Sequence, residues 1–105
     1  MNTTNTTASH CIELAQGSLR PNVAPEVMSA VQRSIEAWLA TQQGFVRRTL
    51  CNLGGDRVMD IVEWRTREDA MRAMGELSQG PLMAEMATVF ALDTFSIQHA
   101  DVIVS

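Results

Sequence analysis

The order of helix-like and strand-like segments constrains the fold of this 105-residue chain more than any other feature. The first helical pattern begins at Pro25 and ends before Gly44, with its apolar residues spaced along one face. A second helical pattern follows Thr66 and ends at Gly80, and residues 82–90 are predicted to form a further short helix. Both main patterns are amphipathic, so we expect each helix to pack one face against a sheet.

Four further segments show the alternation and the β-rich composition of strands: 10–16, 45–51, 57–64 and 95–104. Gly54 and Gly55 lie in the short connection between the second and third strands, which predicts an antiparallel hairpin. In the last strand the apolar phase shifts at residues 99–101, which predicts either a bulge or a change of partner there. The order β-α-β-β-α-(α)-β predicts a ferredoxin-like α+β domain with all helices on one face of an antiparallel sheet. The first strand should then lie between the third and fourth, with the second at an edge.

Length and composition bound the class of protein. The chain is 46% hydrophobic and 19% charged, which is globular, and its length allows one domain, residues 10–105, after a Thr/Asn-rich tail, residues 1–9, that we expect to be disordered. The net charge of −4, with no basic cluster beyond Arg47 and Arg48, argues against nucleic-acid binding. No apolar run is long enough to span a membrane, and no signal peptide is recognisable, so we expect a soluble cytoplasmic protein.

The residues that usually bind metals or cofactors are sparse. Cys11 and Cys51 fall on strands that are not predicted to be neighbours, so a disulfide is not expected, and two thiols are too few for a cysteine-rich metal site. The His, Asp and Glu residues have no compact metal-ligand spacing, and no phosphate-binding glycine loop, catalytic triad or CxxC motif is present. We therefore predict neither a metal ion nor a cofactor.

One face of the predicted sheet would be left without a covering layer. Because the helices cover only one face, the opposite face should carry Met59, Ile61, Val102 and Val104. These side chains are too apolar to be left in water, so we predict a homodimer in which a second copy covers them.

Asp60 and Trp64 are the first candidate site residues. They are four residues apart on one strand, so both project from the same face, with Val62 between them. If that face meets the helices, burial would raise the pKa of Asp60, which could then act as a general base, while Trp64 could stack on a planar ligand. Alternatively, Asp60 lies near the sheet margin, paired with Arg48 or Arg57, and Trp64 is a core residue.

His99 is the third candidate. His10 and His99 lie on strands that are predicted to be neighbours, so they could form a proton-shuttling pair with Asp101 orienting His99. A purely structural role for each histidine is the alternative. The methionines of residues 71–86 lie at helical spacings and would either line an adaptable hydrophobic pocket or fill the core.

Three motifs together resemble a known family. Gly44-Phe45, the strand residues 60–64 (Asp-Ile-Val-Glu-Trp) and the helix start 67–70 (Arg-Glu-Asp-Ala) are similar to those of the dimeric α+β barrel superfamily. Within it, the chain resembles the antibiotic biosynthesis monooxygenase-like (ABM-like) domains over residues 10–104. That family includes cofactor-free oxygenases acting on quinol-like aromatics, haem-degrading enzymes and isomerases.

The resemblance also implies site residues. In the polyketide-quinone oxygenases of this family, an Asn and a Trp four residues later line the pocket, and the matching positions here are Asp60 and Trp64. Asp60 departs from this pattern. An ionised carboxylate would repel a phenolate or superoxide that the amide of an Asn could hydrogen-bond. The Asn and His typical of the haem-degrading branch have no counterparts in residues 10–16 and 71–90, so haem degradation is not expected.

The resemblance suggests a cofactor-independent monooxygenase-like enzyme acting on a small aromatic or quinol-type molecule in a pocket between sheet and helices. Trp64 would contact the ring, and Asp60 or His99 would take the proton that makes the substrate reactive toward oxygen. The alternative is a non-catalytic homodimer that binds a small hydrophobic metabolite or serves a stress-responsive role. An ACT-like regulatory module shares the element order, but no residue favours it.

Overall fold

A computed structural model describes residues 10–104 of the chain, so the predicted disordered tail, residues 1–9, lies outside the described residues. Seven elements follow one another along the chain: β1 (Cys11–Leu19), α1 (Pro25–Ala40), β2 (Phe45–Gly54), β3 (Arg57–Trp64), α2 (Arg67–Gln79), α3 (Leu82–Met86) and β4 (Phe90–Asp101). This is the predicted element order. None of the helices in the described part of the chain is long and apolar enough to cross a membrane.

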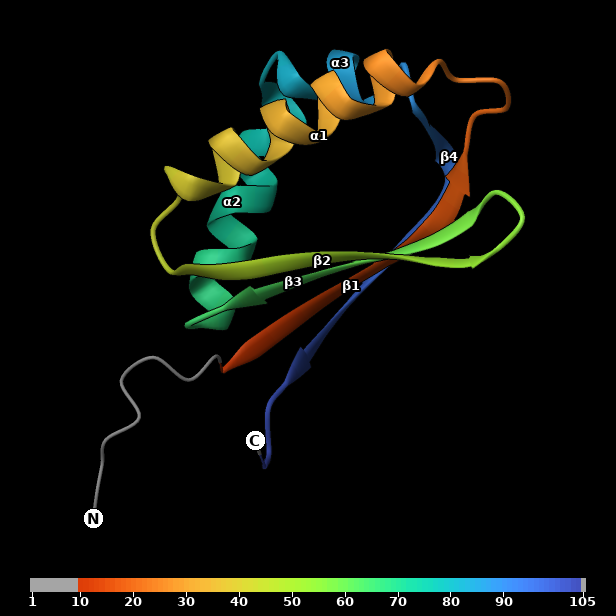
Figure 1. Ribbon diagram of the computed structural model, residues 1–105. Coiled ribbons are helices and arrows are strands. Elements are labelled where there is room, and N and C mark those ends of the chain that lie inside the picture. The colour runs from red at the N-terminus through yellow and green to blue at the C-terminus, as the bar shows by residue number, and fades with distance from the viewer. Residues whose placement is uncertain (1–9, 105) are drawn as a thin grey trace.

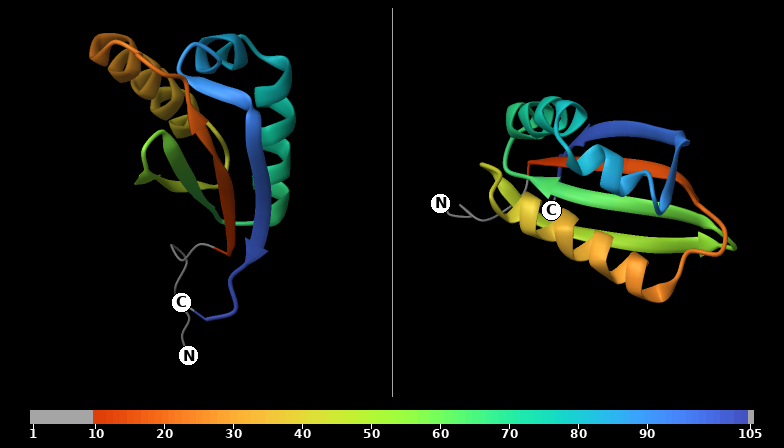
Figure 2. Two further views of the ribbon diagram at one scale, coloured as in Figure 1. Left: turned by 90° about the vertical axis from the view of Figure 1, so that its right-hand side faces the viewer. Right: turned by 90° about the horizontal axis from the view of Figure 1, so that it is seen from above.

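The four strands form one antiparallel sheet in the order β2-β3-β1-β4. All three helices lie over the same face of this sheet (Figures 1 and 2). The predicted ferredoxin-like topology is therefore confirmed, with β1 between β3 and β4 and β2 at an edge. The apolar core lies between the sheet and the helices and includes Val31, Ile35, Leu39, Val58, Val62, Trp64, Val89 and Phe90.

The start of α2 is held by a side-chain cap. The Thr66 hydroxyl accepts a hydrogen bond from the backbone N–H of Asp69 at 3.0 Å. A hydrogen bond from Arg72 lowers the pKa of the Asp69 carboxyl, and the Thr66 side chain lowers it further. Gly44 has a positive φ of 82°, and a Cβ there would overlap the Asp69 carboxylate. Glycine is thus required where the chain enters β2 beside α2.

Three strands are longer than predicted. β1 continues to Leu19 and β2 to Gly54, while β4 begins at Phe90 instead of residue 95. The short helix after α2 accordingly ends at Met86 and not at residue 90. For β1 and β4 the physical reason is the pairing of Leu19 with Phe90, whose buried ring packs edge to face on Phe95 with centroids 5.5 Å apart. For β2 it is the pairing of Asn52 and Gly54 with β3.

The predicted bulge lies at a different place. β1 and β4 pair regularly through residues 99–101, and their register shifts instead between Gln16 and Ser18. At that point the Phe95 ring occupies the space over Gly17, where a Cβ would overlap it. The prediction at 99–101 was wrong because His99 and Asp101 are polar residues on the inner, helix-facing side of the sheet, where polar partners meet them.

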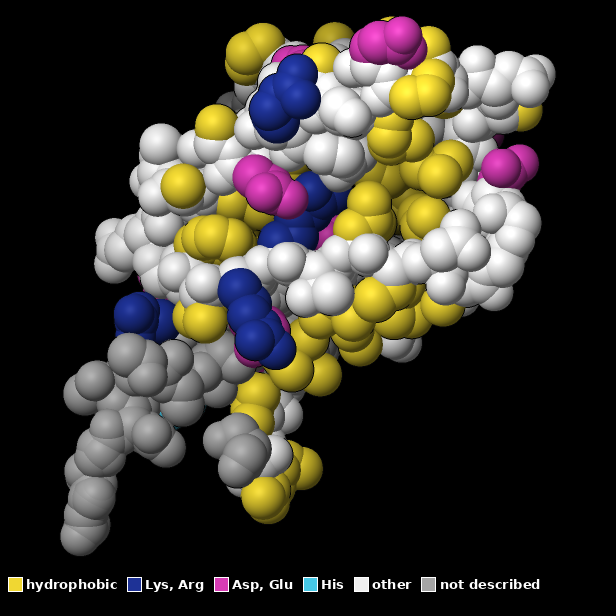
Figure 3. Space-filling model, in the orientation of Figure 1, with side chains coloured by type: hydrophobic (Ala, Val, Ile, Leu, Met, Phe, Trp, Pro, Cys, Tyr) yellow, Lys and Arg dark blue, Asp and Glu magenta, His cyan; other side chains and the backbone are white. Residues whose placement is uncertain are grey.

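The outer sheet face carries an apolar surface. Met59 and Ile61 alternate with the buried residues of β3 and therefore point away from the helices, as predicted, together with Ile12 and Leu14 of β1. Figure 3 shows hydrophobic side chains gathered along the underside of the sheet. Val102 and Val104 follow the end of β4, although the Val102 backbone N–H still donates to the His10 carbonyl at 2.9 Å, and their place on this face stays a prediction.

The two cysteines lie on strands that are not neighbours, as predicted, and both are free thiols. Cys11 is buried in the core, and burial raises the pKa of its thiol. Cys51 of β2 pairs with Met59 of β3, so its side chain lies on the outer face of the sheet.

Candidate functional site

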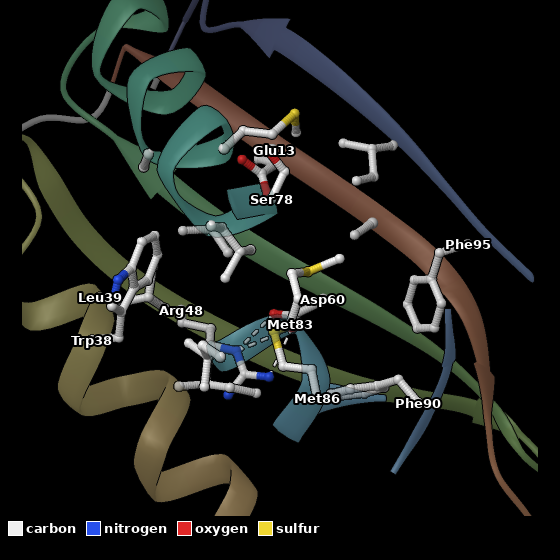
Figure 4. A pocket seen from close by; sticks show the side chains of 18 of the residues that line it. Glu13, Trp38, Leu39, Arg48, Asp60, Ser78, Met83, Met86, Phe90 and Phe95 are labelled. Carbon is white, nitrogen blue, oxygen red and sulfur yellow. Dashed lines mark hydrogen bonds and ion pairs between the residues drawn. The ribbon is translucent and has the colours of Figure 1, made fainter. Parts of the chain in front are cut away.

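A cavity of about 290 Å³ lies between the inner face of the sheet and the helices (Figure 4). Its walls are mostly aliphatic, aromatic and thioether side chains from all three helices and all four strands. The largest of them are Trp38, Trp64, Phe90, Phe95, Met83 and Met86. Of the methionines on α2 and α3, Met74 also lines the cavity, as one of the two predicted roles has it, whereas Met71 is exposed and fits neither role. A space of this size and lining suits a small planar apolar molecule.

Charged side chains from three adjacent strands lie on the floor of the cavity. Glu13 comes from β1, Arg48 from β2 and Asp60 from β3, and Ser78 of α2 adds a hydroxyl (Figure 4). The strand register brings them together, because Ala15 pairs with Asp60 and Glu13 therefore lies diagonally across from it. A buried charge in an apolar layer is costly unless it is paired, so the partners of these side chains matter.

Asp60 is paired with Arg48. Nε of the guanidinium donates to the two carboxylate oxygens at 2.9 and 3.1 Å, and Nη2 donates to Oδ2 at 2.7 Å. The side chains are only 4% (Arg48) and 14% (Asp60) exposed, so little water competes for the bond. Nη1 of Arg48 also lies 3.7 Å from Glu36 of α1. Asp60 thus faces the helices and lines the cavity, as the first interpretation expects. It is also paired with Arg48, as the alternative expects. Its carboxylate is already engaged, which disfavours it as a free base.

Glu13 is the second buried carboxyl group of the cavity, and it meets His99. The two residues are directly opposite each other on β1 and β4, and His99 Nε2 lies 3.2 Å from Glu13 Oε1. Burial raises the pKa of Glu13, the hydrogen bond with His99 opposes this rise, and the negative charge of Asp60 adds to it. Glu13 is therefore the carboxyl group of the cavity whose pKa is raised by burial.

Trp64 is a core residue that also lines the cavity. The side chain is 2% exposed, packs edge to face on Phe45 with centroids 5.9 Å apart, and also lines the cavity. Its indole N–H makes no hydrogen bond of ordinary geometry, although it is close enough to Glu13 to lower that pKa slightly. Trp64 is thus a core residue with a face available to a ligand.

The predicted pairing of His10, His99 and Asp101 does not form. His10 is exposed at the start of the described chain, and His99 contacts Glu13 instead. Asp101 is bound by Arg67, whose Nε lies 3.2 Å from Oδ1. Among residues 10–104, no three His, Cys, Asp or Glu side chains come together in a way that could hold a metal ion.

Sequence reasoning missed Glu13 as a site residue. Its signal was an acidic residue on the strand face that carries the small residues Cys11, Ala15 and Gly17, where an apolar side chain would be typical. Arg48 was considered only as a charge partner, and the structure places it within the cavity wall.

The comparisons with known proteins concern the fold. No family model matches the sequence, and no curated protein matches it. SnoaB, a cofactor-independent oxygenase from Streptomyces nogalater, is similar in structure, with a TM-score of 0.65 and 19% identity over 93% of this chain and 95% of SnoaB. A Bordetella bronchiseptica protein, provisionally named an antibiotic biosynthesis monooxygenase, has a TM-score of 0.73 and 14% identity over 92% of this chain and 100% of its own.

The chain shares the ferredoxin-like α+β fold of these two proteins. A dimeric ferredoxin-like protein from an uncultured marine organism is also similar, with a TM-score of 0.63 and 10% identity over 96% of this chain and 94% of that one. At these identities the similarity establishes the fold, and the chemistry must be argued from the cavity of this chain.

Proposed function

We propose that the protein is a monooxygenase-like enzyme that binds a small hydroxylated aromatic or quinol-type molecule in the cavity. The observation that carries this proposal is a buried carboxyl group, Glu13, with a raised pKa and a histidine partner on the floor of an otherwise apolar cavity. Apolar walls favour a planar ring, and the carboxylate is positioned to accept a proton from a ring hydroxyl or an acidic CH group. The likeness to SnoaB supports the reaction class.

The proposed chemistry needs no electron donor other than the substrate. Glu13 takes a proton from the bound molecule, and His99 accepts it in turn through the hydrogen bond that joins the two side chains. The electron-rich anion transfers electrons to O₂, and a carbon–oxygen bond forms. The second oxygen atom leaves as water with the two hydrogens of the substrate, so a ring CH₂ becomes C=O. One substrate and one O₂ thus yield one carbonyl product and one water.

The remaining cavity residues would position the ring and exclude water. Trp64 and the other aromatic walls contact the ring faces, and the Asp60–Arg48 pair borders the polar end. Exclusion of water strengthens the electrostatic interactions of Glu13 with the substrate and protects a reactive anion from protonation.

Oxygen uptake tests the proposal. Purified protein is incubated with anthrone, hydroquinones and naphthols while dissolved O₂ is followed beside a protein-free control. We expect consumption above the control for at least one compound, and for anthrone one O₂ per anthraquinone formed. Binding of these compounds without oxygen consumption would contradict the oxygenase and favour the alternative, a protein that only binds a hydrophobic metabolite.

We further propose that the protein is a homodimer in which a second copy covers the outer sheet face. Ile12, Leu14, Met59 and Ile61 form an apolar surface there, and each is only partly buried in the single chain. Apolar surface of this kind on a sheet typically marks an interface. The similar protein that is named dimeric supports this assignment.

Light scattering tests the dimer. We expect the wild type to have twice the chain mass of 11.6 kDa at micromolar concentration, and Ile61→Glu to have the chain mass alone, because the substitution places a charge in the centre of the buried surface. Gln79→Glu, which adds the same charge on the exposed end of α2, should remain dimeric. A wild-type particle of 11.6 kDa would refute the proposal.

A further inference from the structure

We propose that the cavity selects uncharged hydroxyarenes over the same rings carrying a carboxylate, and that Asp60 sets this preference by occupying Arg48. The inference rests on the proposed function only in taking the cavity as a site for aromatic molecules. It adds the charge that those molecules can carry and the residue that determines it.

The first observation is that the guanidinium of Arg48 is already engaged. It is the sole Lys or Arg side chain lining the cavity within the described chain, and it is the natural partner for a ligand carboxylate. Its Nε and Nη2 are bound to Asp60, and Nη1 faces Glu36. A ligand carboxylate could therefore make a two-point contact with the Nε–Nη2 edge of the guanidinium only by displacing Asp60, a partner held there by three hydrogen bonds.

The second observation is the sign of the charge around the cavity. Glu13 and Asp60 line it and Glu36 contacts Arg48, whereas Arg48 and, when protonated, His99 are the cations beside them. Burial raises the pKa of Glu13, and the nearby charge of Asp60 adds to that rise, in keeping with a site where a further negative charge meets two carboxylates. A further carboxylate would be repelled across a poorly hydrated space. A neutral hydroxyl group can instead donate a hydrogen bond to Glu13.

Calorimetric titration with 1-naphthol and 1-hydroxy-2-naphthoate at pH 7 tests the inference. These compounds share a ring and a hydroxyl group and differ in one carboxylate. We expect the wild type to bind 1-naphthol at least about tenfold more tightly, since one charged hydrogen bond or one repulsion is worth at least that factor. In Asp60→Asn, the Arg48 guanidinium no longer faces a carboxylate on β3, which should strengthen the binding of hydroxynaphthoate at least about tenfold and change that of naphthol by less than about threefold.

Matched variants separate this effect from a general loss of charge. Glu63→Gln removes one carboxylate from the same strand but on the outer face, where Glu63 is bound to Arg47, so it should leave the preference unchanged. If Asp60→Asn proves unfolded by circular dichroism, Glu36→Gln provides the second test. It removes the weaker partner of Arg48 and should shift the preference in the same direction by a smaller factor.

Three results would overturn the inference. They are equal affinity of the wild type for both compounds, a preference unchanged in both Asp60→Asn and Glu36→Gln, and binding of neither compound to any variant. Oxygen uptake tests the proposed function separately from the selectivity. Naphthol binding with the expected preference but without oxygen uptake from any of the aromatics contradicts the oxygenase alone, and oxygen uptake with equal affinities contradicts the selectivity alone.

Discussion

Replacing Glu13 with glutamine should lower the rate of oxygen consumption by at least about a hundredfold, the lower end of what a positioned general base contributes. Glutamine keeps the size of the side chain and a hydrogen bond to His99, but it cannot take a proton. We expect kcat to fall while KM for a neutral substrate changes little. Steady-state oxygen uptake measures both constants, and Glu63→Gln on the outer face should retain the wild-type rate.

The pH dependence gives an independent reading of the same residue. Glu13 must be ionised to act as a base, so the wild-type rate should rise with pH through its pKa, which burial places above the ordinary value of 4.5. In Glu13→Gln that rise should be absent. A variant that keeps the wild-type rate and pH profile would show that the proton goes elsewhere, with His99 as the next residue to replace.

The contribution of Glu13 to folding stability should fall as pH rises, whereas the reaction rate should increase. A carboxyl group whose pKa is raised by folding keeps its proton longer in the folded than in the unfolded chain, so its contribution is full below pH 4.5 and is lost as pH rises through the folded pKa. Urea unfolding at a series of pH values should show this loss in the wild type and not in Glu13→Gln. This measurement reports on the burial of Glu13 without reference to any reaction.

The fold was predictable because each element carries its own pattern. The Gly54–Gly55 turn defines the hairpin, and the alternation of β3 by itself places Asp60 and Trp64 on one face. These are local signals, and they survive in any arrangement of the remaining chain. The predicted ends of β1 and β4 were wrong because they depend on a contact between distant parts of the chain. Leu19 and Phe90 are held in strands by pairing with each other across the sheet.

The candidate site was only partly predictable, because it depends on register. Glu13 acquires its role from His99, which lies 86 residues away and directly opposite on β4. Nothing in residues 10–16 indicates that partner, and the apolar Ile12 and Leu14 direct attention to the outer face. The pairing of Arg48 with Asp60 similarly requires the register of the β2–β3 hairpin. Sequence patterns give the face of a residue, whereas its chemical partner comes from the neighbouring strand.

Replacing Arg48 with methionine should lower the free energy of unfolding by about 3–5 kcal/mol, the usual cost of removing one member of a buried ion pair. Methionine retains much of the apolar stem but leaves the Asp60 carboxylate, 14% exposed, without its cation. Arg47→Met is the matched control, because Arg47 is 72% exposed and its pair with Glu63 should contribute less than about 1 kcal/mol. Urea denaturation of the three proteins measures both differences.

The double variant Arg48→Met with Asp60→Leu separates charge burial from packing. If the cost arises from an unpaired buried carboxylate, removing that carboxylate as well should recover most of the stability, because an apolar pair of similar volume is often as stable as a buried ion pair. Equal losses in the single and double variants would instead indicate that the arginine stem supports the α1 side of the cavity. Recovery would also mean that stability alone does not require the ion pair. Its position in the cavity wall would then be explained by the ligand charge that Asp60 and Arg48 together exclude.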